Sequence, residues 1–244
     1  MHRIVYLLVF LAVLFNGQSN AADTKPVRIT ATSWLVADGT GKIIQGENTD
    51  QQRSIASITK LITAMVVLDA NQNLDEFLKP YTRREMIQLA LVKSDNQASL
   101  DLCKHYPGGT VQCVRAMNDK VKSLGLTKTQ FIESSGLSVM NVSTAEELIK
   151  IVIEAAKYTE IIVAARTSEV KIKIKKKWLI FHNTNPIIGK RHDFVVSKTG
   201  FINASGGCIV MMLDTEIGRK IVVVLGSKNT HTRIPEAEFI ARIN

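Results

Sequence analysis

The chain has 244 residues, of which 45% are hydrophobic and 22% are charged. This balance excludes an intrinsically disordered protein, and the length suits one well-buried domain. The 31 basic residues outnumber the 22 acidic ones and give a formal net charge of +9. Such a charge favours anionic partners, among them wall polymers, nucleic acid and membrane surfaces.

The first residues of the chain have the pattern of an export signal. Arg3 is followed by an apolar stretch from Ile4 to Phe15, and the small residues up to Ala21 offer a cleavage site. This apolar stretch of about 12 residues is shorter than the roughly 20 that span a bilayer, so we favour a cleaved signal over a membrane anchor. We therefore expect a signal peptide at residues 1–21 and one exported domain at residues 22–244. Export argues against nucleic acid as a partner.

Strand patterns lie at both ends of the chain, and helical patterns lie between them. The pattern predicts strands at 28–37 and 42–47, joined by Asp-Gly-Thr-Gly, and later extended segments at 169–181, 194–201, 208–214 and 219–227. It predicts helices at 54–70, 82–93, 96–106, 111–125, 145–157 (opened by a capping-box sequence at 143–147) and 234–243. This order favours the α+β class, with an antiparallel five-stranded sheet built from both chain ends, flanked by helices and carrying an inserted helical lobe.

A serine and a lysine stand three residues apart at the start of the helix expected at 54–70. Ser57 and Lys60 share one face of a helix that is otherwise apolar and should be buried. A serine hydroxyl becomes a strong nucleophile when a neighbour takes its proton, and a lysine does so only when neutral. Burial and a second cation nearby both lower a lysine pKa. The spacing alone is common by chance, because Ser168 and Lys171 repeat it in a segment expected to be an exposed strand.

Two further short motifs supply other polar groups. Ser94-Asp95-Asn96 follows the helix expected at 82–93, and Lys198-Thr199-Gly200 lies in an apolar, strand-like segment. Taken singly, the first is explained as a helix cap and the second as a strand end. In this order, and together with the Ser-x-x-Lys pair, they match the three signatures of serine β-lactamases and penicillin-binding proteins.

The similarity extends well beyond these motifs. The stretches that carry it are SIASITKLITAMVVLDA, HYPGG, AMNDKVKSLGL, SSGLSVMNVSTAEEL, HNTNPII and KTGFINASGGCIVM. Over residues 27–240 the chain resembles the exported D-alanyl-D-alanine endopeptidases, a branch of the low-molecular-mass penicillin-binding proteins. The resemblance implies a DD-peptidase-like fold, a periplasmic catalytic domain at 22–244, and hydrolysis of the bonds between D-alanine and diaminopimelate that cross-link peptidoglycan. We expect no cofactor or metal, because HExxH and paired-cysteine spacings are absent from the sequence.

The resemblance also implies a role for each residue of the first two motifs. Ser57 would attack the carbonyl carbon and form an acyl-enzyme, with Lys60 as the general base. Ser94 would relay a proton towards the leaving amine. Asn96 would hold the substrate backbone and help to order Lys60.

The third motif would bind the substrate. Lys198 and Thr199 would bind the carboxylate beside the scissile bond, and Gly200 would let the substrate run close to the strand edge. The backbone N–H groups of Ser57 and Phe201 would form the oxyanion hole. β-Lactams, which mimic the substrate, would trap Ser57 as a slowly hydrolysed ester.

Three other functions share these motifs. A D-alanyl-D-alanine carboxypeptidase that trims pentapeptide stems is the main alternative, and such enzymes commonly carry a second β-rich domain and a C-terminal anchor that this chain is expected to lack. A class A β-lactamase would add a Glu-x-x-Leu-Asn sequence, which we do not find. A non-catalytic wall-binding or β-lactam-sensing module is disfavoured because Ser57, Lys60, Ser94 and Lys198 are all present.

Three other features leave their roles open. Cys103 and Cys113 flank a turn and could form a disulfide, whereas Cys208 is expected to be a buried small hydrophobe. The resembled enzymes have a longer stretch between the positions of Pro80 and Tyr81, which puts the cross-link preference in doubt. A lysine run at 171–177 is expected to be a solvated strand face, with attraction to anionic wall polymers as the alternative.

Overall fold

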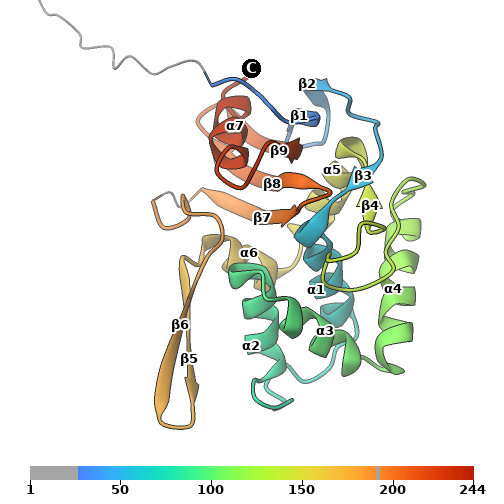
Figure 1. The fold of residues 1–244 in the computed structure, drawn as a ribbon, viewed down its shortest axis with the longest axis vertical. Coiled ribbons are helices and arrows are strands. Elements are labelled where there is room, and N and C mark those ends of the chain that lie inside the picture. Colours follow the sequence, from blue (N-terminus) through green and yellow to red (C-terminus); the bar gives the residue numbers. More distant parts are fainter. Residues whose placement is uncertain (1–26, 191–192) are drawn as a thin grey trace, which may run out of the picture.

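A computed structural model describes residues 27–190 and 193–244 (Figure 1). The signal peptide predicted at residues 1–21 lies outside the described residues. The five strands of the main sheet are β1 (Ser33–Asp38), β2 (Ile43–Glu47), β7 (Phe194–Ile202), β8 (Gly206–Thr215) and β9 (Gly218–Ser227). All neighbours pair antiparallel in the order β2-β1-β9-β8-β7. The α+β class and the sheet built from both ends of the chain are therefore confirmed.

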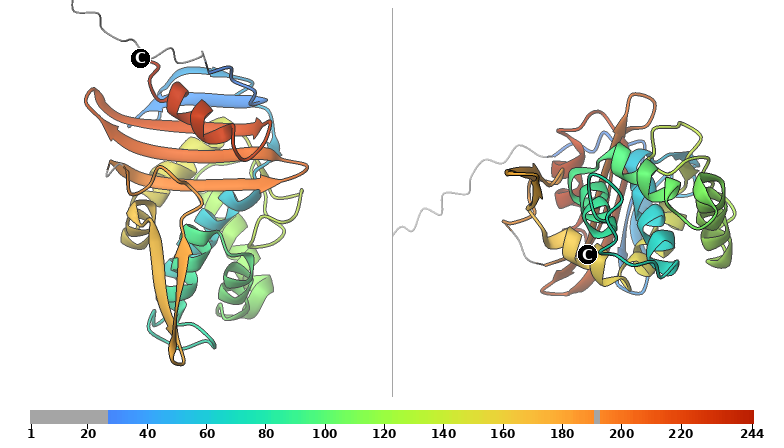
Figure 2. Two further views of the ribbon diagram at one scale, coloured as in Figure 1. Left: turned by 60° about the vertical axis from the view of Figure 1, so that its left-hand side comes forward. Right: turned by 90° about the horizontal axis from the view of Figure 1, so that it is seen from below.

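Helices cover both faces of this sheet, as the two views of Figure 2 show. The helix α7 (Arg233–Ile240) lies on one face, and the larger helical lobe lies against the other. The lobe contains the 3-10 turn η1 (Ala56–Ile58), α1 (Thr59–Asp69), α2 (Arg83–Gln88), the π-helical turn η2 (Leu89–Lys93), α3 (Asn96–Lys104), α4 (Gly109–Ser123), α5 (Ala145–Ala155) and α6 (Thr159–Arg166). Two short strands, β3 (Arg53–Ser54) and β4 (Val142–Ser143), pair beside it.

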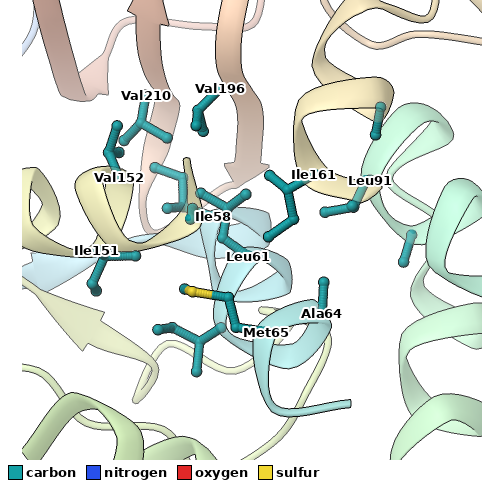
Figure 3. Close-up of a cluster of buried hydrophobic side chains, with 14 of the residues drawn as sticks. Ile58, Leu61, Ala64, Met65, Leu91, Ile151, Val152, Ile161, Val196 and Val210 are labelled. Atoms are coloured by element: carbon teal, nitrogen blue, oxygen red, sulfur yellow. The ribbon is translucent and has the colours of Figure 1, made fainter. Parts of the chain in front are cut away.

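The helix α1 runs through the centre of the molecule and is buried on every side. Its residues from Thr59 to Val67 are all buried, as expected from the sequence, so no face of the helix is open to solvent along this stretch. Figure 3 shows its apolar side chains between the sheet, represented by Val196 and Val210, and α5, represented by Val152. A helix buried on every side is stable only inside a core, and this position fixes the residues at its start.

Two elements differ from the sequence prediction. The segment before the lysine run forms the helix α6, which the sequence analysis did not predict. The single extended segment expected at 169–181 is a hairpin of β5 (Glu169–Ile174) and β6 (Lys177–His182) that reverses at Lys175 and Lys176. The reversal was missed because it contains neither glycine nor proline, and Lys175 takes the positive φ of 53° instead.

The cysteine and helix-cap predictions are also decided by the structure. Cys103 of α3 and Cys113 of α4 form a disulfide, and Cys208 is a buried free thiol. Thr144 caps α5 by accepting a hydrogen bond from the backbone N–H of Glu147, at 3.1 Å. The carboxylate of Glu147 does not complete a capping box, since it accepts from the backbone of Thr127 and Lys128 instead.

Candidate active site

Lys60 lies one helical turn after Ser57, and its side chain is fully buried. Its Nζ donates hydrogen bonds to Ser57 Oγ at 2.7 Å, to Asn96 Oδ1 at 2.7 Å and to the carbonyl oxygen of Ser135 at 2.5 Å. Ser57 itself is half-buried in the turn η1, directly before α1. Ser57 is therefore partly exposed to solvent, whereas Lys60 is not.

The surroundings of Lys60 favour its neutral form. Burial lowers its pKa from the usual 10.5 to about 7, although the negative charges of Glu133 and Asp95 act in the opposite direction. The neutral form, which carries a free lone pair, is therefore accessible near neutral pH. A neutral amine 2.7 Å from a serine Oγ has the distance that proton transfer requires.

The backbone around Ser57 is tightly held by neighbouring segments. Ala56 has the positive φ of 46°, which turns the chain sharply into the nucleophile. A Cβ placed on Gly136 would lie 2.0 Å from Ala56 O, and one on Gly200 would lie 3.0 Å from Ser57 N. The two glycines therefore allow a loop and the strand β7 to approach the backbone of Ser57.

The Ser94-Asp95-Asn96 motif forms the junction between η2 and α3. Ser94 ends η2 in the left-handed conformation, with φ 61°, and the carboxylate of Asp95 caps α3 by accepting from Ala98 N at 2.9 Å. Asn96 is the first residue of α3 and reaches Lys60. The structure thus shows a helix cap at Asp95, while the residues on either side of it face the site.

Lys198 of β7 is almost completely buried and contacts the second serine. Its Nζ donates to Ser94 Oγ at 2.8 Å and to Thr199 O at 2.9 Å. Burial, and then the positive charges of Lys60 and Arg233, lower the pKa of Lys198 well below its usual value. The repulsion between Lys198 and Lys60 is mutual, so a proton on one disfavours a proton on the other. The second cation expected near Lys60 is Lys198, whose own pKa Lys60 lowers, whereas the low pKa of Lys60 comes from burial.

The strand β7 lies at the edge of the five-stranded sheet and carries the remaining predicted residues. Thr199 is buried and its hydroxyl donates to Thr184 Oγ1 at 2.6 Å. The carbonyl oxygen of Gly200 accepts from the buried Arg233 at 2.7 Å, and Phe201 is exposed at the end of the strand. Among the described residues β7 pairs in this sheet only with β8, so its other edge can receive an extended peptide.

With this geometry established, comparison with known proteins gives a consistent result. A sequence profile of the family described as D-alanyl-D-alanine carboxypeptidase (Peptidase_S11) matches residues 19–79 and 76–229. The chain belongs to this peptidase family. The resemblance to DD-peptidases drawn from the sequence is thereby confirmed.

Relatives of this peptidase include D-alanyl-D-alanine endopeptidases. The protein of that description from Escherichia coli is 38% identical over 262 aligned residues, covering 95% of this chain and 84% of its own. The one from Pseudomonas aeruginosa is 37% identical, covering 97% of this chain and 84% of its own. A penicillin-binding protein from Listeria monocytogenes, solved in its cefotaxime-bound form, shares the fold with a TM-score of 0.80 at 23% identity, covering 90% of this chain and 99% of that one.

The alignments also bear on the segment before α2. The alignment with the E. coli protein is longer than the 244 residues of this peptidase, so that relative has additional residues. The family match is made in two segments that meet at residues 76–79. The break in the family match at these residues agrees with a segment that is short near Pro80.

Sequence reasoning missed several groups that build the site of this peptidase. The carbonyl of Ser135 accepts from Lys60, and Glu133 holds that loop in place by accepting from the N–H groups of Ser135 and Gly136, each at 2.6 Å. Arg233 and Thr184 brace β7. A backbone carbonyl has no residue signature, so the first role could not be read from the sequence. The SSGLS and HNTNPII stretches marked the two loops only as regions of similarity.

Proposed function

We propose that this peptidase is a serine endopeptidase that hydrolyses D-alanyl cross-links in peptidoglycan and that penicillin inhibits it. The observation that carries the proposal is the fully buried Lys60, whose Nζ lies 2.7 Å from the Oγ of the partly buried Ser57. The endopeptidase names of the relatives at 37% and 38% identity support this substrate class. The site chemistry needs no cofactor.

Acylation begins with a proton transfer between these two side chains. Neutral Lys60 takes the Ser57 hydroxyl proton while Oγ bonds to the D-alanyl carbonyl carbon, which gives a tetrahedral oxyanion and a Lys60 ammonium. The N–H groups of Ser57 and Phe201 stabilise the oxyanion, and such a donor typically contributes about 3–4 kcal/mol. The carbon–nitrogen bond then breaks, the leaving amine gains a proton by way of Ser94, and Lys60 returns to its neutral form.

Deacylation repeats these steps with water. A water molecule gives a proton to Lys60 while its oxygen attacks the ester carbonyl, and the Ser57 Oγ leaves with the proton that Lys60 returns. Asn96 orients Lys60 through the 2.7 Å contact during both halves. With a β-lactam, the leaving group stays tethered to the acyl chain, so water is hindered and the ester on Ser57 persists.

The substrate carboxylate is bound by Lys198 and Thr199. An incoming anion raises the pKa of a neighbouring lysine, so binding offsets the burial and repulsion that lower the pKa of Lys198. In the resulting complex Lys198 is charged and paired with the substrate carboxylate, and Lys60 is the neutral lysine. Gly200, which has no side chain, permits the substrate to lie along β7 close to Ser57.

The same chemistry serves a D-alanyl-D-alanine carboxypeptidase, which is the second candidate because the matched family carries that description. The deciding experiment digests purified cross-linked dimers and pentapeptide monomers and identifies the products by mass spectrometry. Cleavage of the dimers by the native chain, and none by Ser57→Ala, supports the endopeptidase. Release of D-alanine from pentapeptides with intact dimers would replace it by the carboxypeptidase, and rapid turnover of penicillin would indicate a β-lactamase.

Export to the periplasm is the location that suits this substrate. The apolar leader supports removal of residues 1–21, and the described residues contain no helix long and apolar enough to cross a bilayer. The mature protein from a periplasmic extract should begin at Ala22 or Asp23. An intact leader on the mature chain would contradict this proposal.

A further inference from the structure

The hairpin of β5 and β6 projects alongside the helical lobe (Figures 1 and 2), and its two faces differ in character. On one face Val170 and Ile172 are buried against the body of the protein. The register pairs Lys173 with Trp178 and Lys171 with Ile180, and these four residues lie on the opposite face of the hairpin. We call these four exposed residues the hairpin face.

The hairpin face combines positive charge with exposed apolar surface. Trp178 is 64% exposed and Ile180 is 51% exposed, while the Lys173 ammonium lies 5.9 Å from the centre of the indole ring. Lys175, Lys176 and Lys177 continue the charge at the tip, where all three are exposed. β5, the strand that carries both lysines, also carries the acidic residue Glu169, which forms an ion pair with Lys171 at 3.0 Å. Exposed lysines on a strand discourage unwanted pairing with strands of other chains, and this would explain the lysines. It would not explain why the indole of Trp178 is exposed beside them.

The hairpin face is continuous with the active site along the chain. Thr184 lies six positions after Trp178, and an extended strand covers that separation in about 20 Å. Thr184 accepts the hydrogen bond of Thr199, and on the opposite face of the hairpin Phe181 lies under the ammonium of Lys93, the residue before Ser94. A polymer bound on the hairpin face would therefore be held close to the catalytic groups.

We propose that the hairpin face is a second binding site for peptidoglycan, outside the catalytic centre. The ammonium groups of Lys171 and Lys173 pair with carboxylates of the peptide stems, and the flat ring of Trp178 packs against a sugar ring of the glycan. The proposal rests on the proposed function, because it takes the substrate polymer as the ligand. Two linked contacts raise the effective concentration of cross-links at Ser57. The benefit is confined to polymeric wall, since a small soluble fragment cannot reach both sites.

The test compares the full mature chain with the variants Lys171→Gln/Lys173→Gln and Trp178→Ala. The matched control is Arg115→Gln/Lys122→Gln, which removes two exposed charges from α4, on the other side of the lobe. Binding to isolated wall sacculi is measured by co-sedimentation, and thermal unfolding verifies the fold. We expect each hairpin variant to bind sacculi at least fivefold more weakly, with Trp178→Phe restoring most of the loss and the control within twofold of the native chain.

Two activity measurements separate this proposal from the proposed function. Labelling of Ser57 by a fluorescent penicillin and cleavage of soluble dimers should be unchanged in the hairpin variants, while cleavage of intact sacculi should fall. Unchanged binding to sacculi, or an equal loss in the control, would overturn the hairpin proposal. Binding to anionic phosphatidylglycerol vesicles is measured in the same way. If the hairpin variants lose binding to these vesicles and not to sacculi, the proposal is also overturned and the face is assigned to a membrane surface. Failure of the native chain to cleave dimers would overturn the endopeptidase proposal without affecting the binding result.

Discussion

The chain contains two Ser-x-x-Lys sequences that share their spacing and differ in their surroundings. Lys60 is fully buried and within 2.7 Å of Ser57, whereas the side chain of Lys171 is 59% exposed and pairs with Glu169. Ser57 begins a central helix, which places the two side chains on one face, and Ser168 leads into an outer hairpin strand. We expect the burial of the lysine, rather than the spacing, to make the first pair chemically reactive.

The largest expected effect follows directly from this comparison. Ser57→Ala or Lys60→Met should lower the rate of penicillin acylation and of dimer cleavage by at least 1,000-fold, because a nucleophile and its base act as one unit. Ser168→Ala and Lys171→Met should change either rate by less than twofold. Rates from single-turnover labelling check both statements. A comparable loss at Ser168 would mean that spacing, not burial, defines the reactive pair.

Lys198 is the next residue to test. Lys198→Met removes the proposed partner of the substrate carboxylate, and the loss of a buried ion pair should lower kcat/KM for dimers by roughly 100-fold. A substrate whose carboxylate is amidated serves as the control. The native chain should be much less active on the amidated substrate than on the normal one. For Lys198→Met the activities on the two substrates should be nearly equal. Equal sensitivity of both proteins to amidation would place the carboxylate elsewhere.

The disulfide between α3 and α4 supports the lobe that surrounds Lys60. It closes a short loop, with Cys103 and Cys113 separated by 10 positions. The double variant Cys103→Ser/Cys113→Ser should lower the free energy of unfolding by about 2–3 kcal/mol, chiefly through the unfolded chain. Denaturant unfolding measures the change, and kcat/KM at 25 °C should stay within twofold. A large loss of activity without loss of stability would show that the bridge shapes the site.

Glu133 is expected to give the smallest effect and the most specific one. Its carboxylate orders the loop that presents the Ser135 carbonyl to Lys60, and its charge raises the pKa of Lys60. Glu133→Gln should lower activity roughly fivefold, through about 1 kcal/mol of lost hydrogen bonding. It should also move the acid limb of the pH–rate profile to lower pH, because the neutral form of Lys60 then persists in more acidic solution. Glu133→Asp, which keeps the charge, should leave the limb in place.

The sequence predicted those parts of the site that are carried by residue type. Ser57, Lys60, Asn96 and Lys198 have side chains whose chemistry can be read from the sequence, and the apolar segments around them predicted the sheet and the central helix. The carbonyl of Ser135 could not be predicted, because every residue has one and only the fold selects it. Glu133 was missed for a related reason, since its partners include the backbone N–H groups of Ser135 and Gly136.

The fold was predicted least well where the usual turn and helix signals are missing. The hairpin reversal at Lys175 and Lys176 contains no glycine or proline, and the short helix α6 has no side-chain N-cap hydrogen bond at Tyr158. The π-helical turn at 89–93 belongs to a segment that reads as an ordinary helix. These elements are set by packing against the rest of the molecule, which the local sequence does not show.

The pH dependence of acylation tests the central claim most directly. Because burial lowers the pKa of Lys60 to about 7, the neutral base is scarce below that pH and predominates above it. The second-order rate constant for penicillin labelling of Ser57 should therefore rise about tenfold per pH unit up to about pH 7 and level off above it. A rate that is constant from pH 5 to 9, or that keeps rising beyond pH 10, would contradict the claim that Lys60 is the neutral base.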